Sequence, residues 1–308
     1  MTAEGTIVVA GEALYDLVLT EGTSLSAHPG GGPYNTARTL ARLGRPVAFL
    51  GRISTDRLGA RLRRELENDG VLTSAVVVTD EPTTLAVAEM DRGGIATYNF
   101  YTAGTAASGL QAAEAVSALP ADLAALHFGT LGLVLEPTAT ALEAVLETVD
   151  ERAVVMLDPN VRPQLITDPE EYRRRLTRVL RRVDVVKVSD KDLEWLSPEL
   201  ELVEAARRLV EAGPQVALLT HGASGATVVT AGESTFVPAV AVEVVDTIGA
   251  GDAFGGGFLA WWHECGLGRA ELGDSEAALA GTRFACEVAA LTCTRVGALP
   301  PLRSELSQ

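Results

Sequence analysis

Short runs of consecutive aliphatic and β-branched residues recur along the chain, and each ends near a glycine, an aspartate or a serine. The runs lie at 6–11, 47–51, 75–79, 125–129, 153–158, 183–189 and 216–220. Because apolar residues fill successive positions, these strands are predicted to be buried on both faces, as in a parallel sheet. Segments with apolar residues at helical spacing separate them, at 34–44, 58–70, 137–150, 169–183 and 201–213. The alternation predicts an α/β protein with a mostly parallel, doubly wound sheet.

One region departs from this alternation. Residues 82–101 predict two strands around a turn at Arg92-Gly93-Gly94, with no helix after them, and residues 13–22 are also strand-like. Together they predict a small β-sheet lid, and such lids commonly exclude water from a site. With no linker or repeat in the sequence, we expect one domain over 1–308, with lid insertions at approximately 13–30 and 82–104. Unpaired lid edges also predict a homodimer that forms through the lid.

Composition narrows the partners and the compartment. The 308 residues carry a formal net charge of −16, which argues against general nucleic-acid binding because that function needs a basic surface. The first twenty residues carry no basic region, and no apolar run is long enough to span a bilayer. The three cysteines form neither a CxxC pair nor an even set, which indicates no disulfide framework. We therefore expect a cytoplasmic protein with neither nucleic acid nor membrane as partner.

The stretch VVDTIGAGDAFGGGFLAWW, at 244–262, places many glycines where a strand is followed by a helix. Residues 235–251 are expected to be extended, and the helix is expected to begin at about Ala250. A helix start offers unpaired amides and the positive end of the helix dipole, and glycine lets an anion approach them closely. The stretch therefore predicts an anion cradle. The alternative is that the glycines only permit close packing.

Asp252 lies in the first turn of this helix, where a carboxylate would compete with a bound phosphate. A base that takes a proton from an attacking hydroxyl, beside amides that hold the transferred phosphoryl group, explains its position. The alternative is an acid that only complements the helix dipole.

Several common nucleotide and hydrolase motifs are missing from the sequence. There is no GxxxxGK[ST] motif, and the chain has only two lysines, Lys187 and Lys191. Phe254 occupies the third glycine position of GxGxxG, and Ala226 replaces the last glycine of GxSxG. A P-loop ATPase, a Rossmann dehydrogenase and an α/β-hydrolase are therefore not indicated.

Motifs along the whole chain resemble those of the pfkB, or ribokinase-like, family of carbohydrate kinases. DTIGAGDAF (246–254) resembles the family's C-terminal signature. GEALYD (11–16), GGGPYNTARTLARLG (30–44), GRISTDRLG (51–59), LDPNVRPQL (157–165), VKVSDKDL (186–193) and LLTHGASGA (218–226) stand in the family's order. The resemblance implies a three-layer α/β/α ribokinase-like fold with a small β-sheet lid, and an ATP-dependent kinase that phosphorylates a primary hydroxyl.

The resemblance also implies roles for individual residues. Asp252 would be the catalytic base, and the phosphoryl group would be held by the amides of Gly249, Ala250 and Gly251. The implied sugar-binding residues are Asp16, Gly31, Gly32, Asn35, Tyr98, Phe100 and Arg162. The implied nucleotide-binding residues are Lys187, Ser189, Thr220, Gly222, Gly225 and Cys286. From the residue alone, Asn35 could equally be a helix cap.

Two cations are expected with this chemistry. Mg²⁺ would arrive with ATP, held largely by phosphates and waters, with Asp192 acting through water. Carbonyl groups near Asp246, Ile248 and Gly297 are candidates for a monovalent-cation site that would take K⁺.

Departures from the family's pattern bear on the substrate. Ser189 and Asp192 replace the longer Asn and Glu of an N-x-x-E motif, and Thr102 stands where fructokinase-like and ketodeoxygluconate kinase-like members often have arginine. Without that arginine a substrate carboxylate loses a bidentate partner, so a neutral sugar is expected. Fructokinase is the first choice. The alternatives are ribokinase, 2-keto-3-deoxygluconate kinase, nucleoside kinase, or a catalytically silent sugar- or nucleotide-binding sensor.

Overall fold

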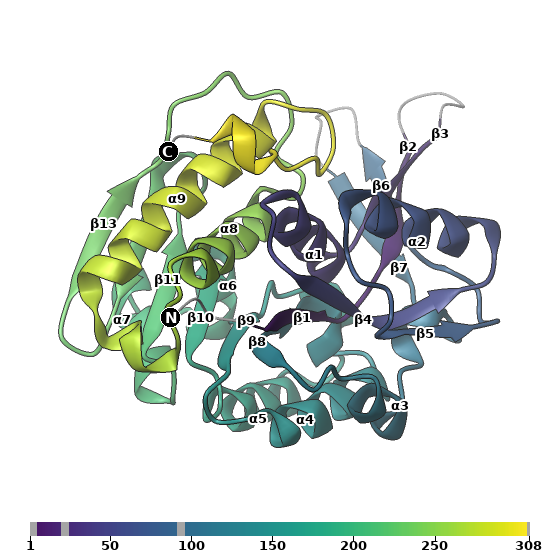
Figure 1. Ribbon diagram of the computed structural model, residues 1–308, viewed down its shortest axis with the longest axis horizontal. Coiled ribbons are helices and arrows are strands. Elements are labelled where there is room, and N and C mark those ends of the chain that lie inside the picture. Colours follow the sequence, from purple (N-terminus) through teal and green to yellow (C-terminus); the bar gives the residue numbers. More distant parts are fainter. Residues whose placement is uncertain (1–4, 20–24, 91–95, 307–308) are drawn as a thin grey trace.

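The predicted hydrophobic runs form neighbouring strands of one sheet in the computed structural model (Figure 1), which describes residues 5–19, 25–90 and 96–306. Within these ranges the sheet has nine strands in the order β13-β12-β11-β10-β9-β8-β1-β4-β5. Their bounds are β1 (Thr6–Ala10), β4 (Val47–Ser54), β5 (Val76–Thr79), β8 (Leu123–Gly129), β9 (Val154–Asp158), β10 (Val185–Ser189), β11 (Val216–Thr220), β12 (Gly225–Val229) and β13 (Ser234–Pro238). In this sheet β12 alone runs antiparallel to its neighbours β11 and β13, and every other pair is parallel, so the prediction of a mostly parallel sheet is confirmed.

The strands are apolar at successive positions because helices cover both faces of the sheet. In β1, Ile7 and Val9 face one hydrophobic core while Val8 and Ala10 face the other, and all four are fully buried. Alternate side chains of a strand point to opposite faces, so two cores require an uninterrupted apolar run.

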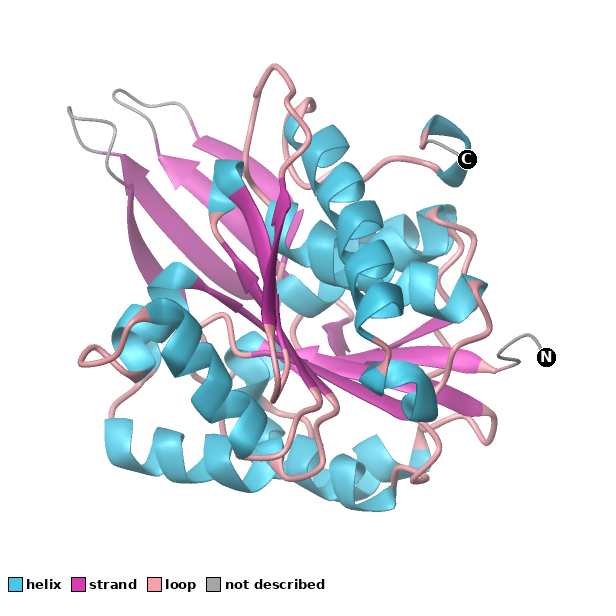
Figure 2. Cartoon of the chain, turned by 90° about the vertical axis from the view of Figure 1, so that its left-hand side faces the viewer, coloured by secondary structure: helices cyan, strands magenta, loops and turns pink. Residues whose placement is uncertain are grey.

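The helices form the two outer layers, visible edge-on in Figures 1 and 2. One layer contains α1 (Gly32–Arg42), α2 (Arg57–Asp69), α8 (Ala250–Glu264) and α9 (Ser275–Cys293). The other contains α3 (Ala112–Ser117), α4 (Thr138–Thr148), α5 (Pro169–Leu180), α6 (Asp190–Leu196) and α7 (Leu202–Glu211). The three-layer α/β/α architecture expected from the resemblance is therefore confirmed.

The sequence pattern missed the shortest helices and overestimated one extended segment. Helices α3 and α6 have six and seven residues, too few to show a helical period. Of the segment 235–251, only the part within β13 is a strand, and residues 239–244 form an irregular loop. The apolar residues of that loop line a cavity instead of pairing in the sheet.

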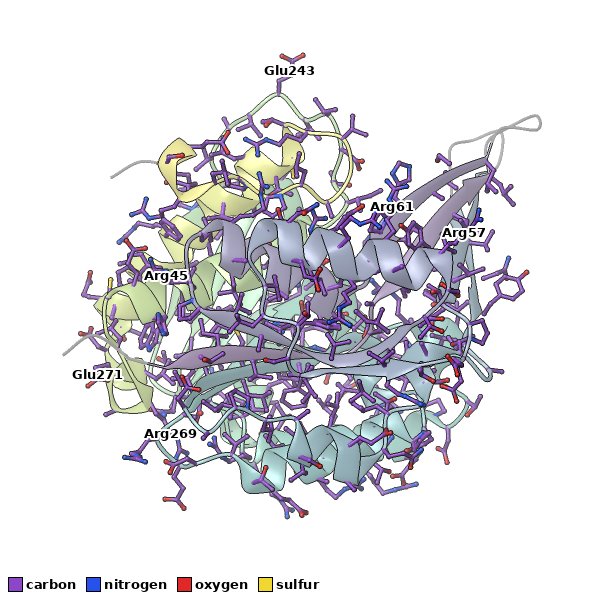
Figure 3. The ribbon with its side chains drawn as sticks, turned by 45° about the vertical axis from the view of Figure 1, so that its right-hand side comes forward. Arg45, Arg57, Arg61, Glu243, Arg269 and Glu271 are labelled. Atoms are coloured by element: carbon purple, nitrogen blue, oxygen red, sulfur yellow. The ribbon has the colours of Figure 1, made fainter. Side chains whose placement is uncertain are left out.

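A second sheet stands apart from the first, in the order β3-β2-β6-β7 (Figures 1 and 2). Its strands are β2 (Leu14–Leu19), β3 (Leu25–Gly30), β6 (Thr84–Met90) and β7 (Ala96–Tyr101). The antiparallel pairing of β6 and β7 confirms the predicted hairpin, whose turn at 92–94 lies outside the described residues. Strand β2 pairs parallel with β6, which joins the two chain segments predicted to form the small sheet. Helix α2 contacts β2, and Arg57 and Arg61 lie on the side of α2 near this sheet (Figure 3).

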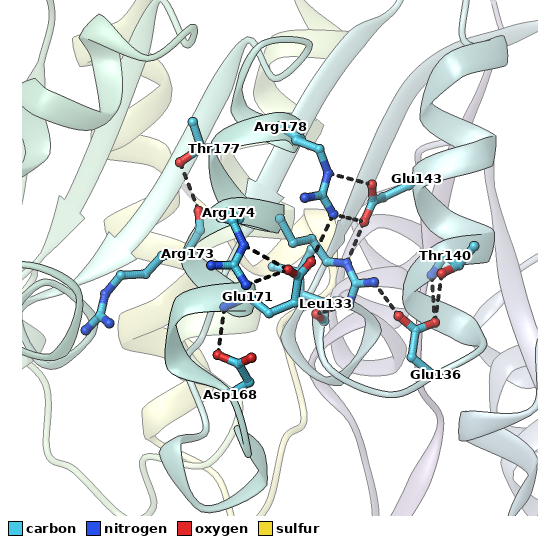
Figure 4. Close-up of polar contacts among 11 residues, drawn as sticks. Leu133, Glu136, Thr140, Glu143, Asp168, Glu171, Arg173, Arg174, Thr177 and Arg178 are labelled. Carbon is cyan, nitrogen blue, oxygen red and sulfur yellow. Dashed lines mark hydrogen bonds and ion pairs between the residues drawn. The ribbon is translucent and has the colours of Figure 1, made fainter.

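The basic run on α5 is neutralised by acids (Figure 4). The Arg175 guanidinium contacts Glu136 and Glu143 near α4, and Arg178 pairs with Glu143 at 3.2 Å. The more exposed pairs on this surface, such as Arg178 with Glu143, contribute at most about 1 kcal/mol each. This surface is therefore a paired contact between two helices and offers no anion site. Among the described residues no helix combines the length and the apolar character needed to cross a bilayer.

Candidate active site

The glycines of the 244–262 stretch have two different functions. Gly249 precedes α8 with a left-handed backbone, φ 75° and ψ 0°, and a Cβ there would lie 2.5 Å from the Cβ of Ala298. Gly256 and Gly257 lie within α8, where a Cβ would come 2.8 Å from Thr39 of α1 or 3.1 Å from Val288 of α9. The first glycine shapes the helix start, and the later two permit close helix packing. The packing interpretation is confirmed for Gly256 and Gly257, and the anion cradle at the helix start stays a prediction.

The start of α8 lies at the carboxyl edge of the parallel strands, where ligands of open α/β sheets bind. Gly249 provides no side-chain cap, and the Gly251 N–H has no acceptor within the described part of the chain. The Ala250 N–H reaches the Thr247 carbonyl at 3.3 Å, so this amide is partly engaged. Unpaired amides at a helix start are able to bind an anion, which is what the predicted cradle requires.

Asp252 points from the first turn of α8 across to α1. Its Oδ2 accepts a 2.8 Å hydrogen bond from Asn35 Nδ2, and its backbone carbonyl accepts one from Thr36 Oγ1 at 3.3 Å. Burial raises the pKa of Asp252 to about 6, the Asn35 hydrogen bond opposes the rise, and the charge of Asp158 adds to it. Asn35 is not a cap, because α1 begins at Gly32 and Asn35 lies inside its first turns. The carboxylate therefore has a pKa not far below neutral pH, and Asn35 holds one of its two oxygens in place.

Asp16 and the glycines before α1 lie close to one another and to Glu12. Asp16 belongs to β2 and is paired across the sheet with His28, and a Cβ on Gly30 would lie 2.1 Å from its Oδ2. Burial raises the pKa of Asp16 to about 6, while Arg162 and His28 lower it. Gly31 has φ 109°, and a Cβ there would lie 2.6 Å from the Glu12 carbonyl oxygen. Only glycine fits this close, left-handed turn.

The second sheet places an apolar surface over this region. Phe100 of β7 packs on a small cluster that contains the buried side chains of Leu14, Ala86 and Leu131. Leu131 lies in the short segment that follows strand β8 of the main sheet, whereas Leu14 and Ala86 belong to the second sheet. The cluster therefore connects the second sheet to the main one. The side chain of Tyr98 lies outside the described residues.

Most of the residues assigned to the nucleotide gather around one cavity of about 380 Å³ beside the cradle. Ala250 and Gly251 form its floor, and the loop after β13 forms a wall from which Glu243 points away into solvent (Figure 3). The other lining residues with an assigned role are Thr220, Gly222, Gly225 and Cys286. An apolar cavity that ends at unpaired amides has room for a flat base at one end and an anion at the other.

Lys187 and Ser189 do not line that cavity. Lys187 is buried below the cradle, where its Nζ pairs with Asp158 Oδ2 at 2.9 Å and would lie 3.0 Å from a Cβ on Gly251. Burial alone would lower the pKa of Lys187, but the charge of Asp158 raises it, so the lysine is cationic. Ser189 caps α6 by accepting from the Asp192 N–H.

The two candidate cation positions differ in their surroundings. Both oxygens of Asp192 accept protein hydrogen bonds, from the Val161 N–H at 2.7 Å and from Ser189. The described residues include no group of three or more His, Cys, Asp or Glu side chains placed to hold a metal. Asp246 accepts from the Ile248 and Gly297 N–H groups, at 3.0 and 2.8 Å, and so ties together the two loops with the candidate carbonyls.

Sequence reasoning assigned no role to Glu12, although it follows a buried strand directly. Its Oε1 accepts from the Gly32 N–H at 3.2 Å, and its buried Oε2 has no partner in the described part of the chain. Burial raises the pKa of Glu12 to about 8, and the charge of Asp252 adds to the rise. An acid at the end of an apolar strand was the available signal.

A buried carboxylate beside unpaired helix-start amides, which line an apolar cavity, fits the needs of phosphoryl transfer. The chain matches the pfkB family carbohydrate kinase profile over residues 5–305. It is 36% identical over 258 residues to a fructokinase of Rhizobium leguminosarum bv. trifolii, covering 82% of this chain and 78% of that protein. It is 33% identical over 304 residues to a Klebsiella pneumoniae fructokinase, covering 97% and 96%.

Solved structures agree with these sequence relatives. A Xylella fastidiosa fructokinase with bound ATP superposes with a TM-score of 0.88 at 29% identity, covering 96% of this chain and 95% of that one. A Vibrio cholerae O395 fructokinase double mutant with fructose, ADP and potassium ion superposes at 0.85 and 26% identity, covering 97% and 95%. The chain therefore belongs to the pfkB family of carbohydrate kinases. It is a fructokinase-like phosphotransferase that acts on a sugar hydroxyl.

Proposed function

We propose that this protein transfers the γ-phosphoryl group of ATP to a primary hydroxyl of a neutral sugar, with D-fructose as the first choice. The observation that carries the proposal is the position of Asp252, between the cradle amides and the region of Asp16 and Asn35. The similarity to fructokinases, including one named with ATP and one with fructose and ADP, supports the choice of both substrates.

The mechanism follows from the order of groups along the site. Adenine would occupy the apolar cavity, and the γ-phosphoryl group would lie at the amides of Gly249, Ala250 and Gly251. Asp252, ionised above about pH 6, would take the proton of the attacking hydroxyl. The cationic Lys187 below Gly251 adds positive potential under the transferred charge. Phe100 and the second sheet would cover the sugar and exclude water.

Mg²⁺ would be bound mainly by the phosphates of ATP and by waters. This fits a site whose nearby acid, Asp192, has both oxygens engaged by protein donors and can contribute only through water. Mg²⁺ neutralises phosphate charge when it is bound. A monovalent cation, K⁺, would lie between the loops that Asp246 joins, which is supported by the potassium ion named with the Vibrio cholerae relative.

The chain is one kinase domain over 1–308, in which the second sheet serves as the lid, and the cytoplasm is its compartment. The lid sheet leaves β3 and β7 as edges, and Leu25 and Tyr101 on those strands are more than half exposed. A homodimer that pairs two lids would cover these edges and side chains. Light scattering at micromolar concentration should give twice the chain mass, and a monomer would contradict the dimer.

The substrate is tested by coupled ADP release with D-fructose, D-ribose, 2-keto-3-deoxygluconate and adenosine, using the Asp252→Asn protein as control for contaminating kinases. We expect the highest kcat/KM with fructose. A higher kcat/KM with ribose, the sugar acid or the nucleoside would assign the chain to that alternative. A higher kcat/KM with the sugar acid would also refute the inference from Thr102 that the substrate is neutral. Sugar binding without any turnover would indicate a silent sensor.

A further inference from the structure

Two loops at the carboxyl edge of the sheet have strained backbones. Within the described residues, Thr130 and Asn160 are the two residues other than glycine with a left-handed backbone, at φ 51° and 37°. They follow the neighbouring strands β8 and β9, whose last residues are paired in parallel. A β-branched threonine rarely adopts this conformation, and such strain concentrates where a side chain must be held in one place.

Each side chain brings a polar atom near one position, the place that a Cβ atom on Gly32 at the start of α1 would occupy. A Cβ atom on Gly32 would lie 2.7 Å from Thr130 Oγ1, 3.3 Å from Asp252 Oδ1 and 3.6 Å from Asn160 Nδ2. The oxygen of Asp252 that faces this space is the one that Asn35 does not occupy. Three polar atoms therefore surround a space that exists because residue 32 has no side chain.

The orientation of the Asn160 amide is fixed from its other end. Arg162 Nη1 donates to Asn160 Oδ1 at 2.6 Å, so the amide NH₂ group is the end directed at Gly32. Neither Asn160 Nδ2 nor Thr130 Oγ1 makes a hydrogen bond to any residue that the structure describes. The site thus presents an amide donor from Asn160, a hydroxyl from Thr130 and a carboxylate acceptor from Asp252. Among the described residues, the amide NH₂ group and the hydroxyl have no hydrogen-bond partner.

This set matches the needs of an alcohol about to be phosphorylated. An alcohol oxygen donates one hydrogen bond and accepts up to two. We propose that Thr130 and Asn160 bind the oxygen of the acceptor hydroxymethyl group in the space over Gly32 and hold its proton toward Asp252. This inference rests on the proposed kinase function and names the residues that select its acceptor.

The proposed step moves one proton to Asp252 and one phosphoryl group to the sugar. The O–H bond breaks as its proton passes to Asp252 Oδ1, the alcohol oxygen forms a bond to the γ-phosphorus, and the bond from that phosphorus to the β-phosphate bridging oxygen breaks, which releases ADP. A carboxylate in the same space would face Asp252 without a proton to donate. The space therefore favours a neutral hydroxymethyl group over an acid.

The test compares binding of D-fructose with that of 1-deoxy- and 6-deoxy-D-fructose, by calorimetry without ATP. Whichever analogue the wild-type enzyme fails to phosphorylate lacks the acceptor hydroxyl. Glycine tolerates the left-handed backbone of both residues, so Asn160→Gly and Thr130→Gly remove the two side chains without straining the backbone. Asn160→Gly also removes the acceptor of Arg162 Nη1, so Thr130→Gly is the cleaner test of the two. We expect each to weaken fructose binding about threefold to tenfold and to leave binding of the non-substrate analogue unchanged. Thr130→Ser, which keeps the hydroxyl, should bind fructose as wild type does.

Turnover gives a second readout. A hydroxyl that is bound but misplaced reacts slowly, so kcat for fructose in Asn160→Gly should fall on the order of a hundredfold. Equal weakening for fructose and both analogues, or none at all, would overturn the assignment while leaving the kinase function intact. If the wild-type protein phosphorylates no sugar, the proposed function fails and this inference fails with it.

Discussion

Asn35 of α1 donates a 2.8 Å hydrogen bond from Nδ2 to Oδ2 of Asp252 in α8, although the two residues are 217 positions apart. The bond joins the starts of two helices whose packing depends on Gly256. Because one carboxylate oxygen is held by Asn35, the other faces the space over Gly32. The carboxylate proposed as the base is thus held in one orientation before any substrate binds, and such preorganisation lowers the reorganisation that a transition state requires.

Asp252→Asn should keep the fold and ATP binding while turnover collapses. The new amide can present its oxygen to Asn35 and preserve the 2.8 Å hydrogen bond, but it cannot accept a proton. Loss of a positioned general base is typically worth about 10²- to 10⁴-fold, so kcat should fall at least about a hundredfold while KM for the sugar changes little.

The matched control for this variant is Glu276→Gln, an exposed acid in the first turn of α9. It should leave kcat unchanged. If Asp252→Asn retained more than about a tenth of wild-type kcat, Asp252 would be a dipole-complementing residue and the mechanism would be wrong.

Gly251→Val should weaken nucleotide binding as well as the rate. Gly251 is a helical residue without a positive φ, so the obstacle is steric: a Cβ would lie 3.0 Å from Lys187 Nζ and project beside the cradle. The branched side chain would displace the lysine from Asp158 and obstruct the phosphates.

Fluorescence titration or calorimetry with ATP measures this effect. The dissociation constant should rise at least about tenfold, the loss of one hydrogen bond to a charged group. Gly251→Ala, with a single methyl group, should show a smaller rise. Unchanged ATP affinity in the valine variant would place the phosphates elsewhere.

Activity should fall as the pH drops below about 6. The pKa of Asp252 is raised to about 6 by burial, and the proposed mechanism requires this carboxylate to be ionised, so kcat/KM should decrease with acidification through this range. Asp16 has a pKa of about 6 for the same reason, and its protonation would weaken sugar binding in the same window.

A profile of log kcat/KM from pH 4.5 to 8 measures both groups. In Asp16→Asn only Asp252 titrates near pH 6, so the acid-side decrease in kcat/KM should remain. The overall kcat/KM of this variant should be lower because a sugar-binding carboxylate is lost. A wild-type rate that stayed constant down to pH 5 would contradict ionisation of Asp252 near pH 6.

The strands and most longer helices could be predicted because they depend on local pattern. Val8 and Val9 face different cores, so successive positions of β1 are apolar. This pattern alone predicts a buried parallel strand. The helix start at Ala250 was also predictable from residue chemistry. The contacts of Thr130, Asn160 and Glu12 were not, because each depends on where loops after different strands meet over α1.

The protonation state of Glu12 was not predictable from the sequence because it depends on burial in the fold. We expect this state to make the stability of the protein depend on pH. The pKa of Glu12 is raised from 4.5 to about 8 in the folded protein, mainly by burial, so the fold favours the protonated acid. Its contribution to stability is complete below the unfolded pKa and is lost as the pH rises through about 8.

Glu12→Gln cannot ionise, yet its side-chain oxygen can still accept from the Gly32 N–H. The free energy of unfolding of the variant, relative to wild type, should therefore increase between pH 5 and pH 8.5, by up to roughly 4 kcal/mol at about 1.4 kcal/mol per pKa unit. Urea denaturation of both proteins at the two pH values measures the difference, from which the shared titrations of Asp16 and Asp252 largely cancel. Glu276→Gln should follow wild type at both values, since its side chain is exposed in both proteins. A constant difference between Glu12→Gln and wild type would mean that Glu12 is ionised within the fold and that its Oε2, without a partner in the described chain, is solvated after all.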